Sequence, residues 1–354
     1  MNELPSIDVI IPVYNAPVLT QRCIDSVVTY LNQSIQHIYI QNDASNAETR
    51  KMLEHQSHPK LHIHHAKKNQ GFGTSVNVAI ARSDADFVLV LNSDTDVDDD
   101  FLPLLCAAFA ADPKLAVISP ALHRYAKYDF SRYIRRPGGH IPAYHFQGHA
   151  FLIRRSIFKE IRGFDPMFGR GYFEDIDLGR RLIQQGWHIG LHPDARIRHM
   201  GGGSFGRGHA YRKLMQRNRS IYFARYPEAR TNVLLVSGRC TIENLPNDLY
   251  RAIENVFEKG GNVHWLTPAP VPKLFCLHMR NSFISVMIVV RLMLRGWLRT
   301  DKRISTVWVL PGTSFLLRAL LAEFIRARKL KVKHWRMRKL QPAIADSLPD
   351  GQQD

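Results

Sequence analysis

The chain has few cysteines, only four among 354 residues. They are Cys23, Cys106, Cys240 and Cys276. Because they lie far apart and form no CxxC pair, the sequence predicts neither a disulfide framework nor a zinc site, and a reducing, cytoplasmic compartment fits best. A basic leader is also missing, and Asp8 interrupts the first apolar run, so we expect no signal peptide.

Long apolar runs are missing as well. The most apolar later stretch, residues 283–290, ends at Arg291, well short of the ~18 residues that a membrane-spanning helix needs. We therefore expect no transmembrane segment. Disorder of the whole chain is excluded too, because 45% of the residues are hydrophobic and apolar runs recur at regular intervals.

Acidic residues are scarce in one region, and this explains the strong positive charge of the chain. The sequence has 48 Lys and Arg against 31 Asp and Glu, a net charge of +17. Residues 280–339 contain 15 Lys and Arg but only Asp301 and Glu323 as acidic residues, a net of +13. An almost neutral body with a basic C-terminal segment indicates an attachment surface, whose partner stays open between anionic lipid and nucleic acid.

Short strand-like runs alternate with helical patterns over the first 120 residues. The runs expected to form strands are residues 7–13, 36–40, 61–65, 87–91 and 115–119. The expected helices are residues 17–31, 47–55, 73–82 and 100–111. The alternation predicts an α/β fold, a Rossmann-like, mostly parallel sheet with flanking helices, in which the chemistry gathers beyond the carboxyl ends of the strands.

A second α/β pattern begins after Pro227, and we place a domain boundary between residues 228 and 229. Strands are expected at residues 231–236, 263–266 and 305–310, and helices at 247–258 and 314–329. Residues 229–354 would thus form a small α/β appendage that ends in a basic helical tail. The preceding domain, residues 1–228, divides into a first part, 1–120, and a second part, 121–228, whose Gly-rich and aromatic composition suits loops and short strands that complete a pocket.

Asp94 and Asp96 directly follow a buried strand. Carboxylate oxygens at such a place are hard ligands suited to Mg²⁺ or Mn²⁺, ions that proteins commonly share with a substrate diphosphate. The alternative is that acidic residues here cap the next helix and favour its N-terminal dipole. We adopt that interpretation for Asp98, Asp99 and Asp100.

A second acidic cluster precedes another helical pattern. It consists of Glu174, Asp175 and Asp177. From spacing alone the cluster fits a favourable helix N-terminus as well as a site for a general base. Two Gly-rich loops, residues 69–73 and 201–204, can approach a phosphate closely, but each is a weak signal alone. His199, just before the second loop, is a candidate third metal ligand, although a lone histidine is more often structural.

Seven segments of the first 227 residues follow one another in the order of a known family. They are Ile11-Pro12-Val13-Tyr14-Asn15, Gln41-Asn42-Asp43-Ala44-Ser45, Asn69-Gln70-Gly71-Phe72-Gly73 with Asn77, Leu91-Asn92-Ser93-Asp94, Gly163-Phe164-Asp165, Phe173-Glu174-Asp175-Ile176-Asp177-Leu178 and Arg198-His199. Together they resemble the inverting family 2 glycosyltransferases of the GT-A fold, especially their rhamnosyltransferase-like bacterial branch. Residues 229–354 fall outside the resemblance.

The resemblance implies a nucleotide site and a metal site. It assigns to the nucleotide Pro12, Tyr14, Asn15, Asp43, Asn69, Gly71, Asn92 and Ser93. Asp43 would accept a hydrogen bond from the base, which favours uracil or thymine and leaves guanine open. Asp94, Asp96 and His199 would hold Mg²⁺ or Mn²⁺ on the diphosphate. Asn92 stands where many members have the first carboxylate of a DXD motif, so strict metal dependence is not implied.

The resemblance also implies the catalytic residues. Residues 1–120 would bind the nucleotide-sugar and residues 121–228 the acceptor. Asp175 would be the general base that deprotonates the acceptor hydroxyl, with Glu174 beside it and His149 and Asp177 in contact with the acceptor. The implied reaction inverts the anomeric carbon. It moves a sugar from a UDP- or dTDP-sugar, dTDP-rhamnose included, to a glycan or lipid-linked acceptor in bacterial surface polysaccharide or lipopolysaccharide synthesis at the cell envelope.

Two other classes of protein stay open at this point. A sugar nucleotidyltransferase also combines a parallel sheet with a carboxylate-bound metal, but it would have a Gly-rich basic loop after the first strand, where this chain has residues 12–16. A nucleic-acid-binding protein would explain the basic C-terminus but not the carboxylates at the strand ends. No nucleic acid partner is therefore expected, and salt-dependent gel shifts would detect one.

Residues 283–298 combine large apolar side chains with Arg291 and Arg295, four positions apart. Such a helix suits a membrane interface, where the basic tail adds attraction to anionic lipid, and it suits equally the core of the appendage with solvated arginines. The first interpretation predicts an enzyme that is peripheral on the inner face of the cytoplasmic membrane.

Overall fold

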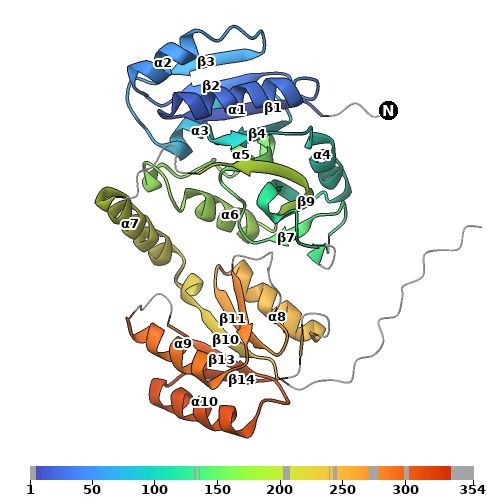
Figure 1. The fold of residues 1–354 in the computed structure, drawn as a ribbon, viewed down its shortest axis with the longest axis vertical. Helices are drawn as coiled ribbons and strands as arrows, with labels where there is room; N and C mark the ends of the chain where they lie inside the picture. The colour runs from blue at the N-terminus through green and yellow to red at the C-terminus, as the bar shows by residue number, and fades with distance from the viewer. Residues whose placement is uncertain are drawn as a thin grey trace, which may run out of the picture. The chain divides into compact units, whose positions relative to one another are not determined.

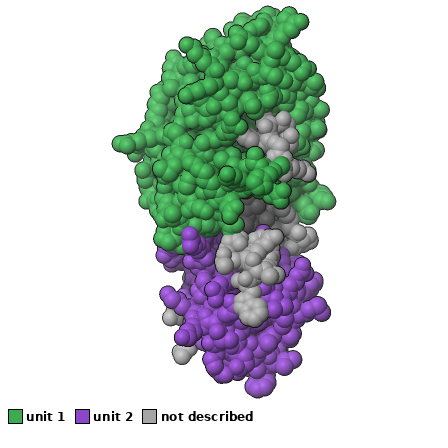
Figure 2. Space-filling model, turned by 90° about the vertical axis from the view of Figure 1, so that its left-hand side faces the viewer, with its two compact units in different colours: residues 1–227 green, residues 228–354 purple. Residues whose placement is uncertain are grey.

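The computed structural model describes residues 5–130, 133–134, 136–201, 208–238, 240–241, 245–270, 278–298 and 303–335. The chain forms two compact units, unit 1 (residues 1–227) and unit 2 (residues 228–354), shown in Figures 1 and 2. The division falls beside the boundary expected at residues 228 and 229, and each unit has a sheet of its own. None of the helices that the structure describes is both long and apolar enough to span a bilayer.

The first half of unit 1 is a parallel sheet with the strand order β3-β2-β1-β4 (Figure 1). Its strands are β1 (Ile7–Val13), β2 (Ile38–Asn42), β3 (Leu61–His65) and β4 (Phe87–Leu91). The helices between them are α1 (Pro17–Tyr30), α2 (Ala47–Glu54) and α3 (Phe72–Ile80). β4 is a continuous run of buried apolar residues, as expected of a strand that is covered on both faces. Because the strands are parallel, all four end at one edge of the sheet.

The second half of unit 1 departs from a simple alternation of strands and helices. β8 (Ala150–Arg154) lies between β4 and β6 (Leu115–Leu122) and runs antiparallel to both. β9 (His188–His199) pairs parallel with β6 and antiparallel with two short strands. These are β5 (Thr95–Asp96) and β7 (Ile141–Ala143). The composition of residues 121–228 predicted loops and short strands, but it did not locate β8 or β9.

Helices cover both faces of the large sheet. The remaining helices of unit 1 are α4 (Leu102–Ala111), α5 (Arg155–Glu160), α6 (Glu174–Gln184) and α7 (His209–Arg225). One cluster of buried apolar side chains joins α1 and α4 to the sheet, and a second joins α3, α5 and α6 to it. The structure therefore has the expected α/β architecture, with the parallel strand ends free to form a site.

Unit 2 has a parallel five-stranded sheet with the order β12-β11-β10-β13-β14. The strands are β10 (Asn232–Val236), β11 (Asn262–Thr267), β12 (Met279–Phe283), β13 (Thr306–Val309) and β14 (Lys331–His334). The helices are α8 (Asn247–Glu258), α9 (Val286–Leu298) and α10 (Phe315–Arg328). The expectation of a helical tail is wrong for β14, which pairs with β13. Residues 336–354 lie outside the described part of the chain.

Candidate active site

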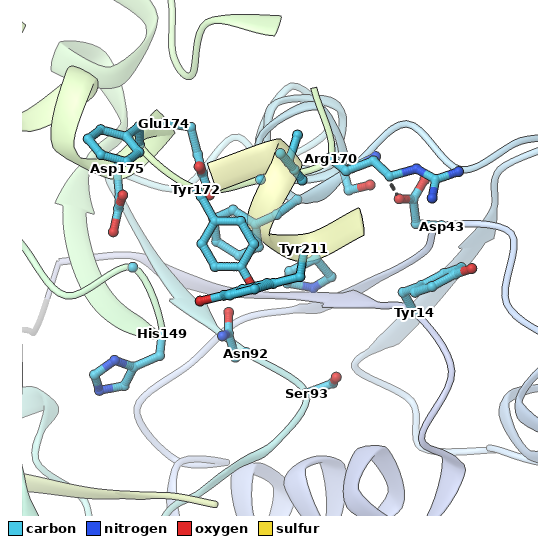
Figure 3. Close-up of a pocket in the computed structure, with 18 of the residues that line it drawn as sticks. Tyr14, Asp43, Asn92, Ser93, His149, Arg170, Tyr172, Glu174, Asp175 and Tyr211 are labelled. Carbon is cyan, nitrogen blue, oxygen red and sulfur yellow. Dashed lines mark hydrogen bonds between the residues drawn. The ribbon is translucent and has the colours of Figure 1, made fainter. Parts of the chain in front are cut away.

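A cavity of about 980 Å³ lies at the carboxyl ends of β1, β2 and β4, and the turn before α6 and helix α7 complete its wall (Figure 3). Twelve of the fifteen predicted site residues line it: Pro12, Tyr14, Asp43, Asn69, Gly71, Asn92, Ser93, Asp94, His149, Glu174, Asp175 and His199. The other three, Asn15, Asp96 and Asp177, are not part of the lining. Figure 3 shows Asp43 and Tyr14 on one side of the cavity and Asp175 and His149 on the other.

Asp43 ties together the loops on its side of the cavity. Its two carboxylate oxygens accept hydrogen bonds from the backbone N–H groups of Gln70, at 2.7 Å, and Gly71, at 2.8 Å. Gly71 has a φ of 89°, and a Cβ there would lie 2.4 Å from the carbonyl oxygen of Gly169. Only glycine fits this crossing of two chain segments. The carboxylate keeps further lone pairs with which it can accept a ligand N–H.

Asn15 supports this side of the cavity from outside the lining. It has a φ of 61°, and Ala16 next to it has a φ of 56°. The Asn15 side-chain oxygen accepts a hydrogen bond from the Asn46 N–H at 2.9 Å, and the Asn15 N–H donates to the Ser45 hydroxyl at 2.9 Å. Backbone strain of this kind persists only where the surroundings hold it and is concentrated at functional sites. Asn15 thus joins the turn after β1 to the turn after β2.

Asp94 and His199 lie side by side at the end of β4 and offer an oxygen and a nitrogen that can bind a metal ion. His199 Nε2 lies 3.1 Å from Asp94 Oδ1, and both residues line the cavity. The ring of His149 stacks on that of His199 with centroids 4.4 Å apart. Burial, and then the neighbouring His199, lower the pKa of His149 to about 3. No group of three His, Cys, Asp or Glu side chains suited to a metal occurs among the described residues. A carboxylate and an imidazole nevertheless fit an ion whose other ligands come from a diphosphate and water.

Asp96 is engaged elsewhere. Its carboxylate contacts Arg22 at 2.5 Å and Arg198 at 3.8 Å. It pairs with Arg198 where β5 meets β9, outside the cavity lining. The structure therefore gives the predicted metal role of Asp96 no support, and two arginines compete for its carboxylate.

The turn that leads into α6 is strained and presents Asp175 to the cavity. Tyr172 and Phe173 have φ angles of 71° and 73°, in the left-handed region that non-glycine residues rarely adopt. α6 begins at Glu174, so Asp175 lies in its first turn. The N–H of Ile176 donates to Asp175 Oδ1 at 2.9 Å. The strain is localised at the residues that aim this carboxylate.

Glu174 and Asp175 form a coupled acidic pair. Burial, followed by the charge of Asp175, raises the pKa of Glu174 to about 8. Burial also raises the pKa of Asp175, and hydrogen bonds from backbone N–H groups oppose that rise. Two interacting carboxyl groups titrate as a pair, and the pair holds one proton more readily than two separate carboxylates would. One of them can therefore accept a proton at neutral pH while the other stays neutral.

Asp177 is held inside the protein and away from the cavity. It is fully buried, and it accepts hydrogen bonds from Arg181 at 2.8 Å, Arg225 at 2.6 Å and the Tyr226 hydroxyl at 3.1 Å. The prediction that Asp177 contacts the acceptor is therefore not favoured by the structure. Spacing alone could not reveal this, because two of its partners lie some fifty residues later in the chain.

Helix α7 holds the strained turn in place. The side-chain amide of Asn218, a fully buried residue, donates to the carbonyl oxygens of Phe168 at 2.7 Å, Gly171 at 2.7 Å and Tyr172 at 3.0 Å. α7 also contributes Tyr211 to the cavity wall, where it meets Tyr172 edge to face with centroids 5.0 Å apart. The second Gly-rich loop, between β9 and α7, lies largely outside the described residues.

Five described residues of the lining carry a buried polar atom that has no hydrogen-bond partner within the structure. The atoms are Asn69 Oδ1, Ser75 Oγ, Asn92 Oδ1, His149 Nε2 and Glu174 Oε2. Buried polar groups are normally paired, so a cluster of such atoms around one cavity calls for an explanation. A polar ligand that fills the cavity would provide one.

The lining residues that were not predicted include Arg170, Tyr172 and Tyr211, which have polar groups suited to binding. Arg170 and Tyr172 flank Gly171, at the edge of the acidic motif, so their position next to that motif was the available signal. Figure 3 shows Arg170 on the side of Asp43. Tyr211 had no such signal, because only the packing of α7 brings it to the cavity.

Comparison with known proteins agrees with this fold. Residues 8–164 match the family model described as Glycosyl transferase family 2. The matched residues make up less than half of the chain and all lie in unit 1, so this unit is similar to the family 2 glycosyltransferases. GalNAc-T7, solved with UDP, GalNAc and Mn²⁺, shares the fold at a TM-score of 0.51 and 14% identity, over 72% of this chain and 55% of that one.

Two curated relatives illustrate the breadth of the family. The N-acetylglucosaminyl-diphospho-decaprenol L-rhamnosyltransferase of Mycobacterium tuberculosis is 27% identical, over 43% of this chain and 62% of the relative. The hyaluronan synthase of Pasteurella multocida is 29% identical, over 33% of this chain and 12% of that protein. The matched region thus spans about three fifths of the rhamnosyltransferase and a small part of the hyaluronan synthase.

Proposed function

We propose that this protein is an inverting glycosyltransferase. It transfers a sugar from a UDP- or dTDP-sugar to a hydroxyl of a glycan or lipid-linked acceptor in the synthesis of a bacterial surface polysaccharide. The observation that carries the proposal is the opposition of two groups across one cavity: Asp43 on one side and the carboxylate of Asp175 on the other (Figure 3). The similarity to a rhamnosyltransferase named for a lipid-linked acceptor supports the donor and acceptor classes.

The donor's nucleotide would lie on the side of Asp43. The carboxylate accepts an N–H of uracil or thymine there, and the Tyr14 ring beside it offers a surface for the base. The diphosphate would pass over Asn92 and Ser93, which Figure 3 shows between the two sides. The unpartnered oxygens of Asn69 and Asn92 accept from ribose or sugar hydroxyl groups.

Asp175 would act as the general base. Its raised pKa brings it closer to the operating pH, which makes it a better proton acceptor than an exposed aspartate. It removes the proton of the acceptor hydroxyl as the hydroxyl oxygen attacks the anomeric carbon from the face opposite the departing diphosphate, so the configuration inverts. The neutral carboxyl of Glu174 next to it avoids a second negative charge in the acceptor pocket.

Asp94 and His199 would hold Mg²⁺ or Mn²⁺. When bound, such an ion would offset the negative charge that develops on the departing diphosphate. The two residues lie next to Ser93 and Asn92, where we place the diphosphate, and this proximity supports their assignment.

A donor screen tests the proposal. UDP-, dTDP- and GDP-sugars are titrated by calorimetry with and without Mn²⁺, and we expect a uridine or thymidine donor to bind most tightly. Asp175→Asn should keep donor binding and lower kcat by about 10²–10⁴-fold, the usual contribution of a general base. Asp194→Asn, at an exposed position, is the matched control. Failure of every nucleotide-sugar to bind would refute the proposal.

A further inference from the structure

Unit 2 carries a concentration of exposed apolar side chains. More than half of the exposed large hydrophobic residues in the described parts of the chain lie between Phe283 and Val332. The most exposed of them are Phe315 at 81%, Met287 at 79%, Leu316 at 69% and Phe283 at 62%. Single exposed apolar residues are ordinary, but a group of bulky ones in one short region marks an interaction surface.

Helix α9 is apolar on two sides. Val289 on its inner side is fully buried, and Leu292 and Met293 pack with it on the core of unit 2. Met287 and Leu294 are exposed on the outer side, where the exposed Arg291 lies between them. A helix that only covered a sheet would be polar on its outer side, so the outer apolar row indicates a second apolar environment.

The exposed residues of α9 and α10 gather at one edge of the sheet. β12 and β13 belong to the same parallel sheet, so the helices that follow them, α9 and α10, both begin at its carboxyl edge. The two helices contact each other and share one buried cluster (Figure 1). Their first turns therefore lie at the same edge of the sheet. We call the exposed apolar residues there, Phe283, Val286, Met287, Phe315 and Leu316, the apolar edge.

The charges around the apolar edge are almost all positive. Arg291 on α9 and Arg318 on α10 are exposed, and Lys333 near the carboxyl end of β14 is exposed as well. Between residues 280 and 335 the sequence has 12 Lys and Arg against only two acidic residues. One of the acidic residues, Glu323, is already paired with Arg326 at 2.8 Å. The charge balance therefore favours a negatively charged partner.

We propose that the apolar edge inserts into the interface of an anionic lipid bilayer, with the surrounding arginines and lysines on the lipid headgroups. Bulky apolar side chains flanked by cations fit the boundary between acyl chains and anionic headgroups. A second copy of the chain would oppose like charges at this surface. Nucleic acid would leave the four highly exposed hydrophobic residues without an apolar partner. The inference deepens the proposed use of a lipid-linked acceptor but does not depend on catalysis.

Vesicle co-sedimentation with the full chain tests the inference. We expect binding to vesicles of phosphatidylcholine mixed with phosphatidylglycerol, weaker binding to phosphatidylcholine alone, and a decrease with added salt. The variant Met287→Gln/Phe315→Gln/Leu316→Gln should bind on the order of ten-fold more weakly, because it removes the inserting groups without changing the charge. Val18→Gln, which replaces a residue 79% exposed in unit 1, is the matched control and should bind like the wild type.

Further measurements separate the possible failures. Unchanged thermal melting would show that the triple variant is folded, and substituting exposed residues should leave it so. Equal vesicle binding by the triple variant and the wild type would overturn the inference, and so would a dimer that the triple variant disrupts in the absence of any vesicle binding. Vesicle binding without turnover of any nucleotide-sugar would leave this inference standing and count only against the proposed function.

Discussion

Gly148 lies directly against the carboxylate of Asp175: a Cβ at position 148 would stand 2.9 Å from Asp175 Oδ2. Gly148→Ala should therefore displace the carboxylate. Because a shift on the order of 1 Å can cost about 10²-fold in rate, we expect a fall in kcat of about that size with donor affinity unchanged. Gly208→Ala is the control, since Gly208 also lines the cavity but has open space where the methyl group would go. Equal loss in both variants would contradict the proposed position of Asp175.

Asn218 should matter for catalysis although its side chain is buried behind the cavity wall. Asn218→Ala removes the donor for three carbonyl oxygens of the strained turn, and we expect it to lower stability by about 1–3 kcal/mol. Asn218→Asp should be worse still, because a carboxylate offers no N–H. Urea unfolding measures the change in stability, and steady-state kinetics measure the change in kcat. Ser220→Ala, on an exposed position of α7, should change neither. Normal kcat in a folded Asn218→Ala protein would exclude a positioning role.

Glu174 should make the stability of the protein fall with rising pH. Its folded-state pKa of about 8 exceeds that of the unfolded chain, so the folded protein binds more protons between those two values. The stabilisation is complete at low pH and is lost as pH rises through about 8. We therefore expect the free energy of unfolding to be higher near about pH 5 than near about pH 8, with a smaller difference in Glu174→Gln. An unchanged slope in the variant would assign the effect to another group.

Arg170 should bind the donor rather than the acceptor. Because it lies on the side of Asp43, Arg170→Gln should weaken UDP or dTDP binding by about ten-fold, the loss of roughly one charge-assisted hydrogen bond, with little change in acceptor KM. Calorimetry with the free nucleotide measures this without catalysis. Arg212→Gln, at an exposed position on α7, controls for the loss of one positive charge. A selective rise in acceptor KM would instead place Arg170 on the other half of the site.

Asp94 should link metal binding to diphosphate binding. In Asp94→Asn we expect the increase in UDP affinity that Mn²⁺ produces in the wild type to be largely lost, while UDP affinity without metal stays similar. Asp96→Asn should keep the metal effect, because Asp96 is paired with Arg22 and Arg198 outside the cavity. Loss of the effect in Asp96→Asn alone would reverse the assignment.

The sequence predicted well those strands and site residues that depend only on residues close by in the chain. β4 is a continuous apolar run, and β1 is one apart from Asp8. The polar residues after them, such as Asp94, lie at the cavity because the ends of parallel strands meet at one edge. β8 could not be placed from the sequence, since its position between β4 and β6 depends on pairing across long stretches of chain. The buried position of Asp177 could not be predicted either, because its partner Arg225 is far from it in the sequence and reaches it only in the folded chain.

The bonds from Arg225 and Tyr226 to Asp177 define how short a working enzyme can be. A fragment cut where the family match ends, at residue 164, would keep Asp94 but lose Asp175. A fragment cut after β9 would keep Asp94 and Asp175 but lose Arg225 and Tyr226, whose hydrogen bonds to Asp177 hold α6 in place. On the proposed function, the shortest active fragment should therefore end after Tyr226, where the chain divides into its two units, and exchange of the C-terminal unit there should leave Asp175 in place.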